Sequence, residues 1–247
     1  MIRNPLVDEA AEVYLRRREF VILHVIVLFG MALTTVGFWP THSFLTFFRT
    51  ETVPAVLHAT LIIQALGMTI LGLYVGLDRL AESGIIRHSE WIERTTIPIG
   101  TLFRGRIAAA TIHMFLLAAA GLPFVVIAAG PSGSPLPAAL AGTLLVFLSG
   151  LVGRFAGMLV SHLGEQSYVV RVIGGWLFMA AFLVVTAQLY PPLNPVAAII
   201  RVLDSSVRTA LESGVALLAV ALLLAAGYRE SLARHRARSR REAARGW

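Results

Sequence analysis

Residues 55–77 read AVLHATLIIQALGMTILGLYVGL, and they contain no Asp, Glu, Lys or Arg. An α-helix needs about 20 mostly apolar residues to cross the hydrocarbon core of a bilayer. This stretch is therefore long enough to form one membrane-spanning helix. The whole chain shares its character, because 57% of the residues are hydrophobic. Only 14% are charged, whereas soluble domains carry about 25%.

Five further apolar runs reach a similar length, so we predict an all-α, polytopic membrane protein with six transmembrane helices. The predicted spans are Phe20–Trp39, Ala55–Leu77, Arg106–Gly130, Leu136–His162, Val169–Tyr190 and Leu211–Tyr228. The fourth span contains Arg154. It either continues to His162 or ends near Gly153, with the Arg154 side chain reaching to the membrane interface.

The distribution of arginine predicts the orientation of the chain. Short cytoplasmic loops are enriched in basic residues. With six spans, 18 of the 21 basic residues fall on the side of the two termini, and only Arg49, Arg201 and Arg208 fall on the other. We therefore expect both termini in the cytoplasm. The net charge of +7 then matches a basic rim that faces anionic lipid headgroups, and we expect no nucleic-acid partner.

Two segments outside the spans show helical patterns. Residues 6–19 place apolar side chains on one face and charged ones on the other, which favours a short interfacial helix over a plain polar lead-in. Residues 191–210 are too short and polar to span, and they predict extracellular half-helices or a surface helix.

We expect the chain to form one transmembrane domain, 1–228, followed by a basic cytoplasmic tail, 229–247. We expect no cleavable signal peptide, because the first apolar run is too long for one.

The sequence offers little that resembles a catalytic or metal site. The chain has no Cys, which excludes thiolate ligands and cysteine nucleophiles. It also lacks H-E-x-x-H, G-x-S-x-G and a P-loop, so we expect no enzyme activity and no cofactor bound to this chain. The one carboxylate within the predicted spans, Glu212, lies at the outer edge of the last span. That position argues against a proton relay of the usual acidic kind.

Histidine residues give one alternative function. His24 and His113 both fall in the inner half of predicted spans, about 6 and 10 Å from the cytoplasmic edge at 1.5 Å per residue. Two imidazoles on facing helices can ligate a b-type haem. The alternative is therefore a haem-binding membrane anchor of a redox complex, although a membrane histidine also commonly bonds a neighbouring helix.

Glycine pairs at GxxxG spacing occur twice, at Gly72 with Gly76 and at Gly153 with Gly157. Such pairs allow two helices to approach closely. The spacing is common in glycine-rich membrane chains, so it does not identify the helix that each pair contacts.

The segment between the second and third predicted spans is long and highly charged. Its charged residues are Asp78, Arg79, Glu82, Arg87, Glu90, Glu93, Arg94 and Arg104. The wider stretch from Gly76 to Ala110 resembles the permease subunits of ABC-2-type transporters, which place an acidic, Gly-containing helical loop here, then a Thr-Pro step and a Gly-basic pair. The residues that match are Glu82, Glu90, Glu93, Thr95, Thr96, Pro98, Gly105 and Arg106. The family often has Lys where this chain has Arg106, which keeps the charge, and the Asn194-Pro195 step also fits.

This resemblance implies a cytoplasmic coupling loop, 78–105, that docks a separate ATPase. The implied interface residues are Gly84, Ile85, Ile86, Arg87, Glu90, Trp91, Ile92, Glu93, Arg94, Thr95 and Thr96. Isoleucine and tryptophan side chains offer apolar anchors, and the charged residues can set the register with a partner. The alternative is an amphipathic loop on the headgroups with Trp91 as an interfacial anchor.

The resemblance also implies the partners and the location. The expected complex has two copies of an ABC ATPase, which bind ATP and Mg, and two permease subunits, as a homodimer or a heterodimer, among membrane lipids. Its place would be the bacterial or archaeal cell (inner) membrane, and most members export their substrate. The remaining alternative is a membrane scaffold subunit that transports nothing.

Overall fold

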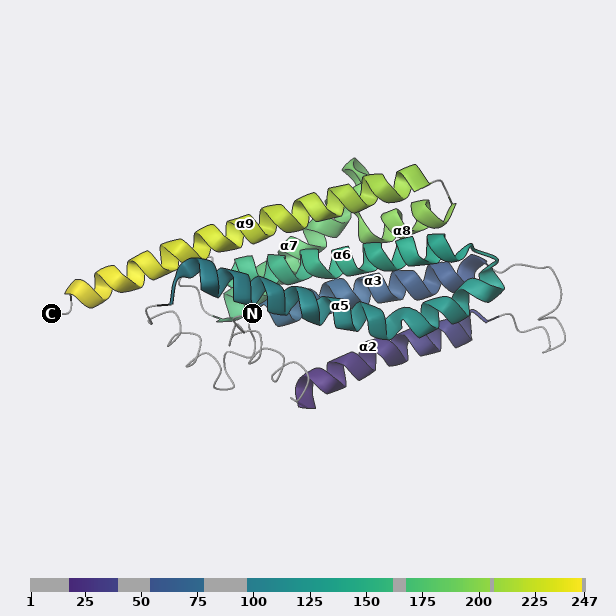
Figure 1. Ribbon diagram of the computed structural model, residues 1–247, viewed down its shortest axis with the longest axis horizontal. Coiled ribbons are helices and arrows are strands. Elements are labelled where there is room, and N and C mark those ends of the chain that lie inside the picture. Colours follow the sequence, from purple (N-terminus) through teal and green to yellow (C-terminus); the bar gives the residue numbers. More distant parts are fainter. Residues whose placement is uncertain (1–17, 40–53, 78–96, 162–167, 205–206, 246–247) are drawn as a thin grey trace.

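The structure is a computed structural model that describes residues 18–39, 54–77, 97–161, 168–204 and 207–245 (Figure 1). These residues form an all-helical bundle, and no strand occurs among them. The elements are α2 (Arg18–Gly37), α3 (Pro54–Gly76), α5 (Ile99–Ser132), α6 (Leu136–Ser161), α7 (Tyr168–Leu189), the 3-10 helix η3 (Pro191–Leu193), α8 (Pro195–Asp204) and α9 (Val207–Arg245).

Five helices, namely α3, α5, α6, α7 and α9, are long and apolar enough to cross a membrane. The apolar part of α2, Val21–Gly37, is shorter. The chain therefore has the character of a multi-pass membrane protein, as the sequence predicts. Two helices exceed their predicted spans by the widest margins: α5 begins at Ile99 rather than at Arg106, and α9 continues past Tyr228 to Arg245.

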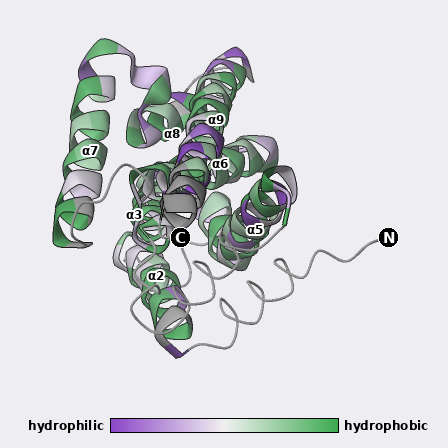
Figure 2. Cartoon of the chain, turned by 90° about the vertical axis from the view of Figure 1, so that its left-hand side faces the viewer, coloured by the Kyte–Doolittle hydropathy of each residue, from purple (hydrophilic) through white to green (hydrophobic). Residues whose placement is uncertain are grey.

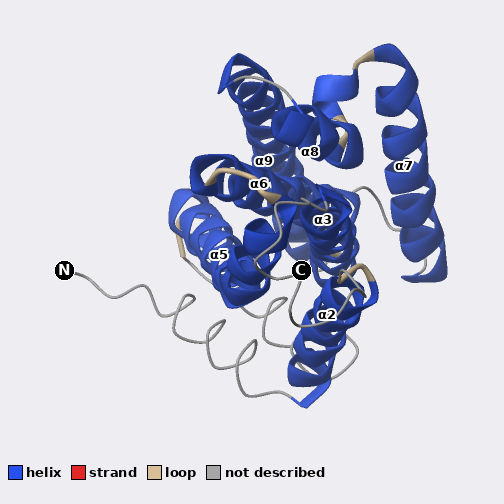
Figure 3. Cartoon of the chain, turned by 90° about the vertical axis from the view of Figure 1, so that its right-hand side faces the viewer, coloured by secondary structure: helices blue, strands red, loops and turns tan. Residues whose placement is uncertain are grey.

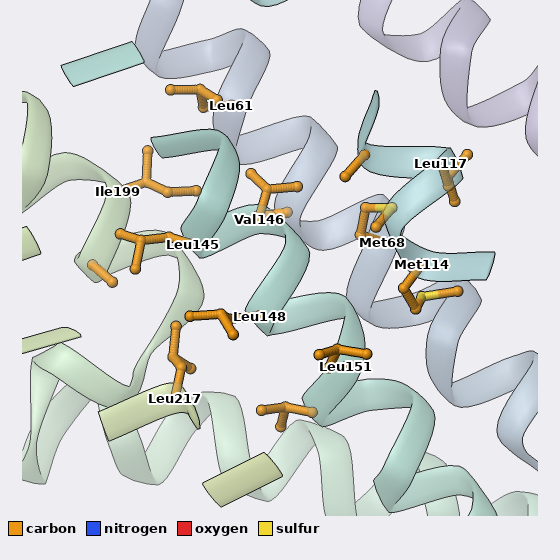
Figure 4. Close-up of a cluster of buried hydrophobic side chains, with 14 of the residues drawn as sticks. Leu61, Met68, Met114, Leu117, Leu145, Val146, Leu148, Leu151, Ile199 and Leu217 are labelled. Atoms are coloured by element: carbon orange, nitrogen blue, oxygen red, sulfur yellow. The ribbon is translucent and has the colours of Figure 1, made fainter. Parts of the chain in front are cut away.

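The centre of the bundle is the pair α3 and α6. In each of these helices 61% of the most apolar window is buried, against 17% in α7. Figure 4 shows the core side chains that α6 contributes, including Leu145, Val146 and Leu148, between side chains of α3, α5 and α9. Figures 2 and 3 show α7 at one edge of the bundle and α2 at another, with α3 between them.

The two predicted glycine pairs lie against each other within this chain. A Cβ built on Gly72 would lie 2.5 Å from the carbonyl oxygen of Gly150. A Cβ on Gly157 would lie 2.5 Å from the carbonyl oxygen of Leu73 and 2.7 Å from the Cα of Gly76. Glycine is therefore required on both helices, because any side chain would push the two backbones apart.

The charged residue of the fourth predicted span is inside the bundle. Helix α6 runs through Arg154 to Ser161, so it does not end near Gly153. Arg154 is only 5% exposed, and its backbone lies against Gly72 and Gly76 of α3. Of the two alternatives for the fourth span, the structure therefore supports the continuous helix, and the Arg154 side chain is buried inside the bundle.

Segment 191–204 folds back onto the bundle. Asn194 caps α8, since its Oδ1 accepts hydrogen bonds from the backbone N–H groups of Val196 (3.0 Å) and Ala197 (3.1 Å). The Nδ2 of Asn194 donates to the carbonyl oxygen of Leu183 in α7 at 2.7 Å. One side chain therefore starts α8 and fixes it to α7, and Pro195 suits the first helical position.

Candidate functional site

The coupling residues inferred from the resemblance, Gly84 to Thr96, lie outside the described residues, as does nearly all of the predicted interfacial helix 6–19. The structure does describe the two ends of the coupling segment. Helix α3 ends at Gly76 and is followed by Leu77, and α5 begins after Ile97 and Pro98. Both ends lie at the end of the bundle from which the C-terminal part of α9 extends (Figure 1), which we call the basic end.

The C-terminal part of α9 is attached to the first turns of α5. Arg106 donates a hydrogen bond to the Tyr228 hydroxyl at 2.8 Å. One turn or more further out, Arg236 donates a hydrogen bond to the backbone carbonyl oxygen of Ile97. Between these bonds Leu102 packs against Leu232, and both side chains are completely buried. We call this contact the α5–α9 clasp.

The aromatic and apolar parts of the clasp reinforce its hydrogen bonds. The rings of Phe103 and Tyr228 lie with their centroids 6.2 Å apart, within the range of favourable aromatic pairs. Ile97 and Ile99 pack against the buried Leu102 and Leu232. Ile97 lies two residues before α5, where the chain enters the helix, so the clasp begins where the coupling segment ends.

One buried face of α9 packs mainly against α6 along the apolar core and continues outward to the clasp with α5. Its buried residues recur every three or four positions, at Leu217, Ala221, Ala225, Tyr228, Leu232 and Arg236. This is the repeat of one helix face. The sequence prediction treated residues 229–247 as a basic tail and missed the clasp. The i, i+4 spacing of Tyr228, Leu232 and Arg236 is the signal that indicates it.

The surface around the clasp is basic. Arg104, Arg229 and Arg234 are exposed on the two clasped helices. The Nε of Arg234 lies 3.1 Å from Oε1 of Glu230, an exposed pair with little energetic weight. Figure 2, which views the molecule from this end, shows hydrophilic colour at several places along α9, whereas the surrounding helices are largely hydrophobic. An acidic surface or anionic headgroups would complement these side chains.

The histidine pair suggested by the sequence exists in the structure. The Nε2 atoms of His24 in α2 and His113 in α5 lie 3.0 Å apart, with ring centroids 5.0 Å apart and an angle of 63° between the rings. His113 is buried and His24 is half-buried. At that separation one Nε2–H donates to the other, unprotonated Nε2, so the pair joins α2 to α5 by a hydrogen bond.

This geometry does not fit the haem alternative. Two imidazoles bound to one haem iron lie on opposite faces of the macrocycle, each with a bond of about 2 Å between nitrogen and metal. Their nitrogens would then be about 4 Å apart with a flat ring system between them. In the structure a direct hydrogen bond occupies that space, and we derive no redox chemistry from His24 and His113. The described residues also contain no cluster of three or more His, Asp or Glu that could hold a metal ion.

Other polar side chains occupy the same α2–α3–α5 junction. The hydroxyls of Thr35 in α2 and Thr60 in α3 are 3.1 Å apart and buried. Nε2 of Gln64 donates to the carbonyl oxygen of Ala118 at 3.3 Å, and its Oε1 is buried without a hydrogen-bond partner. Gln64 fills the space above Gly121, where a Cβ would lie 2.9 Å from Cδ of Gln64. These contacts join helices, and they form no charged path across the bundle.

Glu212 lies at the end of the bundle opposite the clasp. Its carboxylate accepts a hydrogen bond from the Tyr190 hydroxyl at 3.3 Å and is 3.7 Å from the Arg201 guanidinium. The side chain is 44% exposed. Its place near the start of α9 agrees with the edge of the span predicted from the sequence, and its exposure makes it a surface group.

The comparisons with known proteins assign no relative. No protein-family model matches the chain, and no curated protein matches it. The clasp and the polar junction are therefore interpreted from their own chemistry.

Proposed function

We propose that the chain is the permease subunit of an ABC-2-type transporter, which moves a substrate across the cell membrane with ATP hydrolysed by a separate subunit. In this proposal α2 is the first of six crossings, and both termini lie in the cytoplasm. The arginine distribution supports that orientation. The sequence of residues 76–110 supports the class of transporter, and export is the expected direction.

The observation that carries the proposal is the placement of the charged segment 78–96 between two helices that are firmly packed. Helix α3 is in the centre of the bundle, in backbone contact with α6 through Gly76 and Gly157. Helix α5 is attached to α9 by Arg236 and Leu232. A partner that pushes on this segment would move whole helices rather than a loose loop, because close packing transmits displacement.

The polar side chains inside the bundle have contacts that suit a permease without catalytic chemistry of its own. The described polar groups inside the bundle, such as Gln64, Thr35 and the histidine pair, contact neighbouring helices. Nothing in the described residues identifies the substrate, and a lipid, glycan, peptide or ion fits the proposal equally.

Affinity purification of the tagged chain from its native membrane tests the proposal. We expect a protein with a P-loop ATPase sequence to be retained, and we expect the double charge reversal Glu90→Lys with Glu93→Lys to release it. The matched control is Glu212→Lys, which reverses an exposed carboxylate at the opposite end of the bundle. Retention of no ATPase by the parent chain, or equal retention by the double variant, contradicts the proposal.

An absorbance spectrum of the same preparation separates the redox alternative. A Soret band that is lost in His113→Leu would favour a haem anchor over a permease. A stable complex that contains other membrane proteins and hydrolyses no ATP would favour a scaffold subunit.

A further inference from the structure

We propose that the α5–α9 clasp makes α5 and the C-terminal half of α9 one mechanical body, with Tyr228 and Arg236 as the positioning residues. The inference rests on the proposed function, because it concerns the path of movement after the partner ATPase acts on segment 78–96. It extends that function to α9, a helix that is distant in the sequence from the coupling segment.

Three contacts at different heights carry this inference. Arg106 and Tyr228 bond at 2.8 Å, Leu102 and Leu232 pack with no exposed surface, and Arg236 bonds to the backbone of Ile97. A single contact would allow α5 to pivot on α9. Three contacts along about two turns of helix oppose both pivoting and sliding, because either movement must break one of these hydrogen bonds or expose buried apolar surface.

Arg236 is buried in the clasp, unlike the neighbouring arginine of the same helix. Arg236 is 4% exposed, whereas the neighbouring Arg234 is an exposed residue that pairs with Glu230 one turn earlier. Burial of a guanidinium is costly unless it is well bonded. A tail that only supplied positive charge would have no reason to bury one arginine against a backbone carbonyl, so Arg236 has a positioning role.

The clasp contrasts with the low burial of α7. Helix α7 has the lowest buried fraction of the five long apolar helices, and a Cβ on its Gly174 would meet no atom within 4 Å. If an ATPase displaces α5, we expect α9 to follow it and the spacing between α7 and α9 to change. The relative movement therefore falls between the clasped pair and α7.

Spin labels measure these spacings directly, and the absence of native cysteine leaves no background. One pair is Gly100→Cys on α5 with Ala237→Cys on α9, both exposed positions at the clasp. The second pair is Gly174→Cys on α7 with Ala237→Cys. Distances are recorded by pulsed electron resonance in nanodiscs with the co-purified ATPase, without nucleotide and after trapping with ATP and vanadate.

We expect no shift between Gly100 and Ala237 and a clear shift between Gly174 and Ala237 on trapping. In Arg236→Ala we expect the first pair to become nucleotide-dependent, because α5 moves and α9 no longer follows. Arg236→Lys keeps a donor and should restore the parent behaviour, and Arg234→Ala, the matched loss of charge on the same helix, should leave it unchanged. If Arg236→Ala does not fold, Tyr228→Phe is the second variant. It removes the hydroxyl that accepts the hydrogen bond from Arg106, so it should also make the distance between the first pair of labels nucleotide-dependent.

The outcomes separate the two proposals. A nucleotide-dependent shift of the clasp pair in the parent chain overturns the clasp while leaving the permease intact. Unchanged behaviour of the clasp pair in both Arg236→Ala and Tyr228→Phe also overturns it. Absence of any shift in both label pairs, or absence of an ATPase in the preparation, overturns the permease proposal itself and the clasp with it.

Discussion

Gly76 of α3 and Gly157 of α6 lie so close that a Cβ on Gly157 would be 2.7 Å from the Cα of Gly76. The atoms around that Cβ position are backbone atoms of α3, which cannot rotate away as a flexible side chain can. This contact brings the backbones of the two central helices together, and the other helices pack around the pair.

The first prediction concerns this glycine contact. We expect Gly157→Ala to lower the free energy of unfolding by about 3 kcal/mol or more, because the methyl group forces two backbones apart. Equilibrium unfolding in detergent micelles measures the change. Gly174→Ala is the control, since its Cβ meets no atom within 4 Å and alanine is favoured over glycine in a helix by about 0.5–1 kcal/mol. Equal effects of the two variants would contradict the contact.

The second prediction concerns Gln64 and Gly121. We expect Gly121→Ala to destabilise the protein by about 1–3 kcal/mol, because the new methyl group overlaps the Gln64 amide. Gln64→Ala removes that amide, so the double variant should be more stable than the sum of the two single changes predicts. A double-mutant cycle measures the coupling. Strict additivity would show that the two side chains do not meet.

The third prediction concerns the His24–His113 hydrogen bond. Hydrogen bonds between membrane helices contribute about 0.6 kcal/mol on average and up to about 1.7 kcal/mol. We expect a cycle of His24→Leu and His113→Leu to give a coupling in this range. His58→Leu serves as the control, because the His58 ring bonds to the carbonyl of Pro54 within its own helix. Zero coupling between His24 and His113 would refute the pair.

The fourth prediction concerns Asn194. We expect Asn194→Ala to cost about 1–2 kcal/mol, because α8 loses its N-terminal cap. Asn194→Asp retains the acceptor oxygen but loses the donor to the Leu183 carbonyl. Its stability should therefore fall between those of the parent chain and Asn194→Ala when all three are unfolded under the same conditions. A fully stable Asn194→Ala would mean that the cap has no role.

The sequence predicts the position of each apolar helix well, because the length of an apolar run is a local property. The start of α3 at Pro54 and the start of α6 at Leu136 agree closely with the predicted spans. The sequence did not predict the early start of α5 or the extension of α9 to Arg245. The extension of α9 was missed for a physical reason. Residues 229–245 are too polar to be recognised as a span, and their structured part is held by contacts with Ile97 and Leu102, which are more than 120 positions away.

The candidate site was only partly predictable. The depth of His24 and His113 in their spans was enough to predict that they could meet. The coupling residues Gly84 to Thr96 remain a prediction from the resemblance, since they lie outside the described residues. The clasp required the structure, because Arg236 resembles every other arginine of the tail until its buried contact is seen.

Composition and spacing by themselves determined that this protein is helical and that its long helices have the character of membrane spans. Those properties follow from the transfer of apolar residues out of water, which depends on each stretch of chain separately. Only the tertiary structure decided which glycines face each other, that Arg154 is enclosed, and that α9 is attached to α5. These contacts depend on the shapes and hydrogen-bonding groups of segments that are distant in the sequence, and a local sequence pattern does not show which segments will meet.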